Sequence, residues 1–277
     1  MKTRIITALL GFLALLAILF WGGRLFIFVL WAATALAMYE YYHAIEVGGK
    51  HPIKFVGYAA TLMFPVYAIY SYFHDFYVAN SDIILGAILL LSISLLYILY
   101  GICVVKSSEY NFQDAAQTIF AVLYICVPMF MILPLYFGAN GKLLIWILLI
   151  IAWGTDIFAY FIGVFFGKNK MMPELSPKKT WEGFFGGLFG ATLLMTIYGL
   201  AVSSRFDTFD WWVYSILGLV LSLVSQFGDW FASSIKRNVK IKDFGNILPG
   251  HGGFIDRFDS IIFIAPLVYI FTIFFNR

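Results

Sequence analysis

The chain has 277 residues, of which 62% are hydrophobic, only 12% are charged, and the net charge is +3. Soluble globular domains carry about 25% charged residues, so this composition excludes an ordinary soluble protein and predicts an all-α, polytopic membrane protein. The sequence has no long basic stripe, which excludes a nucleic-acid-binding protein. Cys103 and Cys126 lie in apolar stretches without a CxxC pattern, so neither a disulfide nor a zinc site is expected.

Apolar segments long enough to cross a bilayer, about 20 residues each, recur along the chain. The first follows Met1–Arg4 and lacks a small-residue cleavage site, so we predict a retained helix rather than a signal peptide. We predict nine membrane-spanning helices, at residues 5–21, 25–45, 55–73, 82–105, 114–137, 142–166, 181–202, 211–235 and 255–275.

The basic residues are distributed unevenly between the connections. If successive connections lie on alternate sides of the membrane, 14 of the 18 Lys and Arg residues fall on the side of the N-terminus. The other four are Arg24, Lys142, Arg205 and Arg277. The positive-inside rule then predicts a protein of the cell (inner) membrane whose N-terminus and active site are cytoplasmic.

Residues 1–138 contain little that suggests chemistry. Glu40, His43 and Glu46 lie near the end of the second predicted helix, and we interpret them as a helix end at the membrane interface. We therefore expect residues 1–138 to supply packing, lipid contact or a homodimer interface. Residues 139–277 are expected to form the catalytic region, with cytoplasmic loops at 168–180 and 236–254.

The sixth predicted helix carries an aspartate at membrane depth. Asp156 shares one helix face with Ala159, Tyr160, Gly163 and Gly167. We predict a functional role because its depth matches that of Asp229; the alternative is a structural aspartate that is hydrogen-bonded across helices.

The loop that follows offers groups that bind anions. Ser176, Lys178, Lys179 and Thr180 precede a helix start, where hydroxyl, ammonium and backbone N–H groups can contact phosphate. The order GxxxxGK[ST] is absent, which excludes a P-loop ATPase. The glycines at 183, 186, 187 and 190 predict a seam of close helix packing rather than a phosphate cradle.

Residues 226–259 concentrate charge between two apolar segments. Gln226, Asp229, Ser233 and Lys236 share a helix face, and Asp256 and Asp259 are three residues apart at the start of the last helix. Ionisable residues at membrane depth favour a functional reading. Carboxylates beside basic residues suit magnesium, which uses one or two carboxylates plus substrate phosphates; the alternative is a solvated charged loop.

These motifs resemble a known family. Ser234-x-x-Arg237, Lys242-Asp243, Leu248-Pro249, His251-Gly252-Gly253 and Asp256-Arg257-x-Asp259 resemble the signature of the integral-membrane phosphatidate cytidylyltransferases, or CDP-diacylglycerol synthases. Asp156-x-x-Ala-Tyr and Ser176-Pro-Lys-Lys-Thr-x-Glu-Gly are similar to that family as well. The resemblance covers about the C-terminal half of the chain. It implies the conversion of CTP and phosphatidic acid to CDP-diacylglycerol and pyrophosphate, with magnesium at two cation sites.

The resemblance and the residue chemistry together give the expected site. The expected catalytic residues are Asp229, Asp256, Lys236, Arg237, Lys242, Asp243, His251 and Arg257. The expected substrate-binding residues are Ser176, Lys178, Lys179, Thr180, Ser233, Ser234, Gly252, Gly253 and Tyr160. The expected metal ligands are Asp229, Asp256, Asp259 and Asp156. For His251, ordering of the surrounding turn is an equal alternative to contact with phosphate.

Two other functions are considered. An ion-coupled secondary transporter also carries membrane carboxylates, but here the charge gathers on one side and no inverted repeat is found. A CTP-dependent lipid or polyprenol kinase is the second, and the identity of the lipid substrate would separate the two enzymes. A CDP-alcohol phosphotransferase is disfavoured because its Asp-Gly-x-x-Ala-Arg run is absent.

Overall fold

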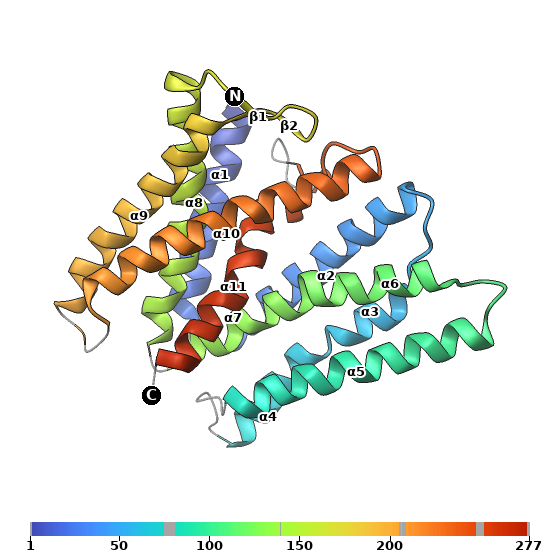
Figure 1. Cartoon of the computed structure of the whole chain (residues 1–277). Coiled ribbons are helices and arrows are strands. Elements are labelled where there is room, and N and C mark those ends of the chain that lie inside the picture. Colours follow the sequence, from blue (N-terminus) through green and yellow to red (C-terminus); the bar gives the residue numbers. More distant parts are fainter. Residues whose placement is uncertain are drawn as a thin grey trace. The chain divides into compact units, whose positions relative to one another are not determined.

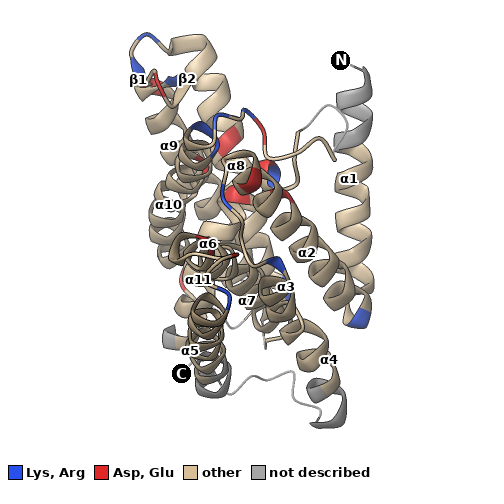
Figure 2. Cartoon of the chain, turned by 90° about the vertical axis from the view of Figure 1, so that its right-hand side faces the viewer, with Lys and Arg blue, Asp and Glu red and all other residues tan. Residues whose placement is uncertain are grey.

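The computed structural model is helical apart from one short hairpin, and it describes residues 2–74, 81–138, 140–204, 206, 209–247 and 252–275 (Figure 1). Long stretches of the helices carry no charged residue (Figure 2). Within the described residues, helices that are long and apolar enough to cross a membrane occupy Gly23–Val47, Ile88–Val105, Phe112–Phe137, Gly141–Phe166, Trp181–Ser203 and Trp211–Asn238. The prediction of an all-α polytopic membrane protein is confirmed, whereas the count of nine crossings stays a prediction.

The chain forms two compact units. Unit 1 contains Met1–Ala139 and Asn238–Phe258, and unit 2 contains Asn140–Arg237 and Asp259–Arg277. The first division lies next to the predicted boundary at residue 138. The connection 238–258, however, groups with the N-terminal helices rather than with the rest of the C-terminal half.

Unit 1 is built from helices that follow the predicted apolar segments. They are α1 (Lys2–Trp21), α2 (Gly23–Val47), α3 (Lys54–Ala60), α4 (Met63–His74), α5 (Ser81–Val105), α6 (Phe112–Ala121), the π-helix η1 (Val122–Cys126) and α7 (Val127–Phe137). Tyr41 and Tyr42 of α2 are almost fully buried in its core, and the Tyr41 hydroxyl donates to Gln117 Oε1 at 2.7 Å.

Two predicted helices of unit 1 differ from straight α-helices. The predicted helix 55–73 breaks between α3 and α4, where the Thr61 hydroxyl donates to Tyr58 O and accepts from Trp31 Nε1. The predicted helix 114–137 contains the π-turn η1 just before Pro128. Proline lacks an N–H and clashes with the carbonyl four residues earlier, and a wider turn accommodates both effects.

Unit 2 contains most of the predicted catalytic region. Its elements are α8 (Gly141–Phe166), β1 (Lys170–Met172), β2 (Ser176–Thr180), α9 (Trp181–Ser203), most of α10 (Trp211–Asn238) and most of α11 (Ile255–Phe275). The predicted loop 168–180 folds as an antiparallel hairpin in which Lys170 pairs with Thr180 and Met172 with Ser176. Thr180 then caps α9, since its Oγ1 accepts the N–H of Gly183 at 3.1 Å.

Glycines let α8 and α9 pack closely. A Cβ added at Gly183 would lie 2.8 Å from the carbonyl oxygen of Ala159, and one at Gly187 would lie 3.0 Å from that of Thr155. The predicted packing seam is therefore confirmed. It fixes α8, which carries Asp156, against α9, which follows directly from the hairpin.

Gly190→Ala should destabilise the protein. The new Cβ would lie 2.5 Å from the Cβ of Phe158, which cannot swing aside without backbone movement. Overpacking of this kind costs about 1–3 kcal/mol, so we expect a lower Tm in thermal unfolding of the detergent-solubilised protein. Gly101→Ala in α5 is the matched control, because nothing lies within 4 Å of the added Cβ there. Equal Tm values for both variants would contradict the seam.

Candidate active site

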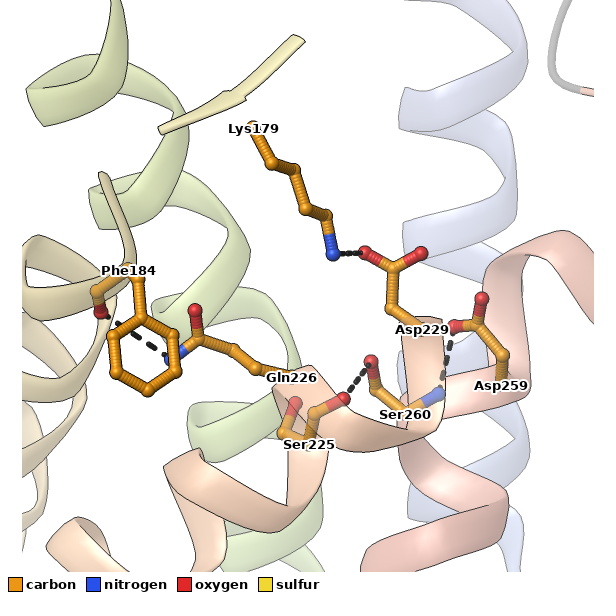
Figure 3. A network of polar contacts seen from close by, with 7 residues as sticks. All are labelled: Lys179, Phe184, Ser225, Gln226, Asp229, Asp259 and Ser260. Atoms are coloured by element: carbon orange, nitrogen blue, oxygen red, sulfur yellow. Dashed lines mark hydrogen bonds and ion pairs between the residues drawn. The ribbon is translucent and has the colours of Figure 1, made fainter. Parts of the chain in front are cut away.

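Three aspartates from three helices of unit 2 form a carboxylate cluster: Asp156 of α8, Asp229 of α10 and Asp259 of α11. Asp259 is buried, and its carboxylate is repelled by Asp229 and Asp156 and attracted by Lys236. Figure 3 shows Asp229 and Asp259 next to each other on adjoining helices. These three are among the four expected metal ligands, and their role as ligands stays a prediction.

Lys179 of β2 balances part of this negative charge. Its ammonium group forms an ion pair with Asp229 Oδ2, toward which the side chain extends in Figure 3. The same ammonium lies 5.6 Å from the ring centroid of Trp230, a distance that allows a cation–π interaction. The hairpin therefore delivers a lysine to the carboxylate cluster, and both side chains of the pair remain 30% exposed.

The crossing of α10 and α11 sets the distance between Asp229 and Asp259. A Cβ at Gly228 would lie 3.0 Å from both Asp259 O and the Cβ of Phe263, so glycine permits this close approach. Ser260 strengthens the crossing because its hydroxyl donates to Ser225 O at 3.2 Å. Its backbone N–H donates to Asp259 Oδ1 at 2.7 Å, which orients that carboxylate.

Unit 2 also contains most of the predicted substrate-binding residues. Ser233 and Lys236 of α10 are both 8% exposed, whereas Ser234 and Arg237 are exposed. Arg237 Nε donates to Leu175 O at 3.4 Å, which joins the end of α10 to the hairpin. The remaining predicted residues of this unit are the half-buried Ser176, the exposed Lys178, the buried capping Thr180 and Tyr160, which is 65% exposed.

Unit 1 contains the other predicted residues, which lie in the connection before α11 and in the first turn of that helix. Asp256 Oδ2 accepts the N–H groups of Phe244 at 2.9 Å and Gly253 at 3.1 Å. Gly252 has φ +83°, and a Cβ there would lie 3.4 Å from Asp256 Oδ2 and 3.5 Å from Asp243 Oδ1. The structure thus brings Asp243 and Asp256 together around Gly252, where only glycine adopts this conformation readily.

The remaining residues of this connection are placed less fully. Lys242, Asp243 and Arg257 are exposed within unit 1. His251, with Leu248 and Pro249, lies outside the described residues. Asp256 belongs to unit 1 and Asp229 to unit 2, so a shared metal site for these two aspartates stays a prediction.

The interpretation of Glu40 as part of a helix end at the membrane interface is wrong. Glu40 of α2 is 1% exposed rather than at an interfacial helix end. Its carboxylate accepts the N–H groups of Phe254 at 2.8 Å and Ile255 at 3.0 Å. An acidic residue several positions inside an apolar segment is the signal that could have indicated this role.

The carboxylate cluster suits a magnesium ion shared with a substrate. In the described part of the chain, no three His, Cys, Asp or Glu side chains are grouped closely enough to enclose a metal by themselves. Magnesium at a phosphate site typically needs only one or two protein carboxylates, because substrate phosphates and water supply the other ligands. Asp229 and the buried Asp259, which repel each other, fit that requirement, and magnesium itself stays a prediction.

Comparison with known proteins gives consistent matches along the chain. The model of the cytidylyltransferase family matches residues 2–275. A phosphatidate cytidylyltransferase of Bacillus subtilis (strain 168) is 33% identical over 279 aligned positions, which cover 100% of this chain and 99% of that protein. One from Staphylococcus epidermidis is 31% identical over 276 positions, covering 99% of each. One from Staphylococcus aureus (strain COL) is 40% identical over 185 positions, covering 65% of this chain and 68% of that protein.

Lys179→Met should lower stability because it leaves Asp229 and Asp259 with less compensating charge. The pair is partly exposed, so we expect a loss of about 1–2 kcal/mol, between the values for exposed and buried pairs. Thermal unfolding in detergent measures the effect. Lys178→Met is the matched control, because Lys178 is exposed on the same strand and should change stability by less than about 0.5 kcal/mol. If the two variants unfold at the same temperature, the ion pair does not support the cluster.

Proposed function

Since the chain belongs to the cytidylyltransferase family, we infer that it is a phosphatidate cytidylyltransferase, an integral membrane nucleotidyltransferase of phospholipid biosynthesis. It converts CTP and phosphatidic acid to CDP-diacylglycerol and pyrophosphate. The structural observation that carries the chemistry is the Lys179–Asp229 pair beside the buried Asp259. CTP is a polyanion and phosphatidic acid is a lipid, so the two meet where charged groups lie within apolar helices. Lysine side chains there can contact phosphate, and carboxylates can bind a metal ion.

The reaction requires little proton transfer from the protein. The second pKa of a phosphate monoester is about 6, so the phosphatidate oxygen is largely ionised at neutral pH and can attack without a strong general base. Attack in line forms a bond from this oxygen to the α-phosphorus of CTP and breaks the bond between the α-phosphorus and the bridging oxygen of pyrophosphate. Positioning and electrostatics supply most of the catalysis in such transfers.

The residues of unit 2 divide these tasks. We propose that Asp229 and Asp259, with Asp156 near them, hold Mg2+, which when bound would neutralise phosphate charge and stabilise the leaving pyrophosphate. Lys179 and Lys236 balance the charge of the carboxylates and of incoming phosphates. The proposed contacts to substrate come from Ser176, Lys178, Ser233, Ser234, Arg237 and Tyr160. Thr180 holds the hairpin against α9 because it caps that helix.

Several further assignments are part of the proposal. The proposed catalytic residues of unit 1 are Lys242, Asp243, Asp256 and Arg257. Asp256 is also proposed as a metal ligand, in addition to its contacts with the backbone of the connection. Residues 139–277 are proposed as the catalytic region. The distribution of Lys and Arg supports a cytoplasmic N-terminus and active site. A homodimer through residues 1–138 is the remaining proposal.

Asp229→Asn should reduce the rate of pyrophosphate release by about 10²–10³-fold, because it removes a negative ligand from the reacting phosphates. The assay uses purified protein in detergent with CTP, phosphatidic acid and magnesium. Asp210→Asn is the matched control, since Asp210 is exposed and its carboxylate accepts from the neighbouring Trp212 Nε1 at 3.2 Å. This variant should keep the wild-type rate.

The same assay separates the alternative functions. A lipid kinase would release CDP and use a lipid alcohol in place of phosphatidic acid, and a transporter would bind substrate without turnover. Either result, or full activity of Asp229→Asn, would contradict the proposal.

Removal of divalent cations should stop the reaction. Chelation with EDTA is expected to abolish pyrophosphate release, and magnesium added in excess of the chelator should restore it, because a bound cation would neutralise the charge of the nucleotide phosphates. Thermal unfolding measured in parallel shows whether the chelated protein is still folded. Unimpaired synthesis in the chelator would exclude the cation from the mechanism.

A further inference from the structure

A buried carboxylate of unit 1 contacts the backbone of the connection before α11. Glu40 of α2 accepts the N–H of Phe254 at Oε1 and that of Ile255 at Oε2, across 214 and 215 positions of sequence. Hydrogen bonds to a charged acceptor are stronger than those between neutral groups, and here both carboxylate oxygens accept one. Only 1% of Glu40 is exposed, so water does not compete for these donors.

Two glycines allow the connection to close around this carboxylate. A Cβ at Gly245 would lie 2.5 Å from Glu40 Oε1, and one at Gly253 would lie 2.8 Å from Glu40 Oε2 and 2.7 Å from the nitrogen of Gly245. Any larger residue at either position would push the chain or the carboxylate away. The contact is therefore built from both sides, by an acid on α2 and by glycines in the connection.

Asp256 completes the arrangement. Its Oδ2 accepts the N–H groups of Phe244 and Gly253, so the two carboxylates together bind four backbone N–H groups of this connection. Ile255 begins α11, and the first N–H groups of a helix have no partner within the helix. A negative charge at this end also interacts favourably with the helix dipole.

We propose that Glu40 is a positioning residue for nucleotidyl transfer, an inference that rests on the proposed function. Its carboxylate fixes the backbone at residues 253–255 and thereby the start of α11, which carries Asp256. Asp243 of the preceding connection lies beside Asp256, on the other side of Gly252. A helix of the N-terminal half thus holds residues of the site. Without this anchor, the Asp256 and Asp243 carboxylates shift, and a misplacement of about 1 Å can cost roughly 100-fold in rate.

Glu40→Gln tests this role most directly. A glutamine amide accepts with one oxygen but turns an NH2 group toward the second backbone donor, so one N–H loses its acceptor. We expect kcat to fall by about 10–100-fold, with a smaller change in KM for CTP. Hydrogen–deuterium exchange of the peptide that contains Phe254 and Ile255 should become faster at a temperature where the variant is still folded. Glu40→Asp, which keeps a carboxylate, should recover part of both losses.

Glu46→Gln is the matched control on the same helix. Glu46 pairs with Lys54 at 2.6 Å through a carboxylate that is 34% exposed, so in the described part of the chain its ionic partner lies on α3 rather than in the connection before α11. Its kcat and its exchange at Phe254 and Ile255 should equal those of the wild type. Wild-type kcat together with wild-type exchange in Glu40→Gln would overturn the inference.

Two further measurements keep the outcome clear. If Glu40→Gln does not fold, Gly245→Ala is measured instead, because its methyl group displaces the carboxylate without removing the charge; unchanged exchange and kcat in that variant would overturn the inference. The exchange measurement uses no substrate. If the wild type releases no pyrophosphate, the proposed function fails, whereas faster exchange in Glu40→Gln still supports the anchoring of the connection by Glu40.

Discussion

The structure depends on how carboxylates are compensated within apolar helices. Removing a charge from water costs several kcal/mol even after relaxation, so each buried acid needs partners. In unit 2, Asp259 stands near two further aspartates, and lysines supply the opposite charge through Lys179 and Lys236. In unit 1, Glu40 obtains the same compensation from backbone N–H groups. The lysine-balanced carboxylates can exchange partners with a charged substrate, whereas the backbone-bound carboxylate serves as a fixed anchor.

Glycine positions convert these interactions into a defined geometry. The α8–α9 seam places the helix of Asp156 against the element that extends the hairpin, and Gly228 lets α11 approach α10 where Asp259 meets Asp229. Gly245 and Gly253 do the same around Glu40. At Gly183, Gly187 and Gly228 a backbone carbonyl lies in the space that a side chain would fill, and at Gly245 and Gly253 the Glu40 carboxylate does. The same glycines therefore allow close packing and place the charged groups.

Much of this fold was predictable because long apolar runs with charged flanks determine helices locally. The segments at α1, α2, α5 and α8 to α11 are predicted within a few residues. Spacing along a single helix does not say which of the four expected metal ligands meet, because that depends on contacts between helices far apart in the sequence. The break at Thr61 depends on Trp31, thirty positions away, and the hairpin depends on pairing across a proline-containing loop. Glu40 was misinterpreted because its partners lie more than 200 positions later. No local pattern reports such partners, and the roles of the site residues remain predictions.

Binding of Mn2+ in the presence of CTP, measured by electron paramagnetic resonance on the purified protein, shows whether the carboxylate cluster holds a cation beside the nucleotide. Mn2+ prefers the same oxygen ligands as magnesium and is visible to this method. We expect the wild type to bind the ion tightly, and Asp229→Asn and Asp259→Asn each to weaken binding, whereas the exposed Asp210→Asn control should not. Unchanged affinity in both aspartate variants would contradict the assignment of the carboxylate cluster as the cation and nucleotide site.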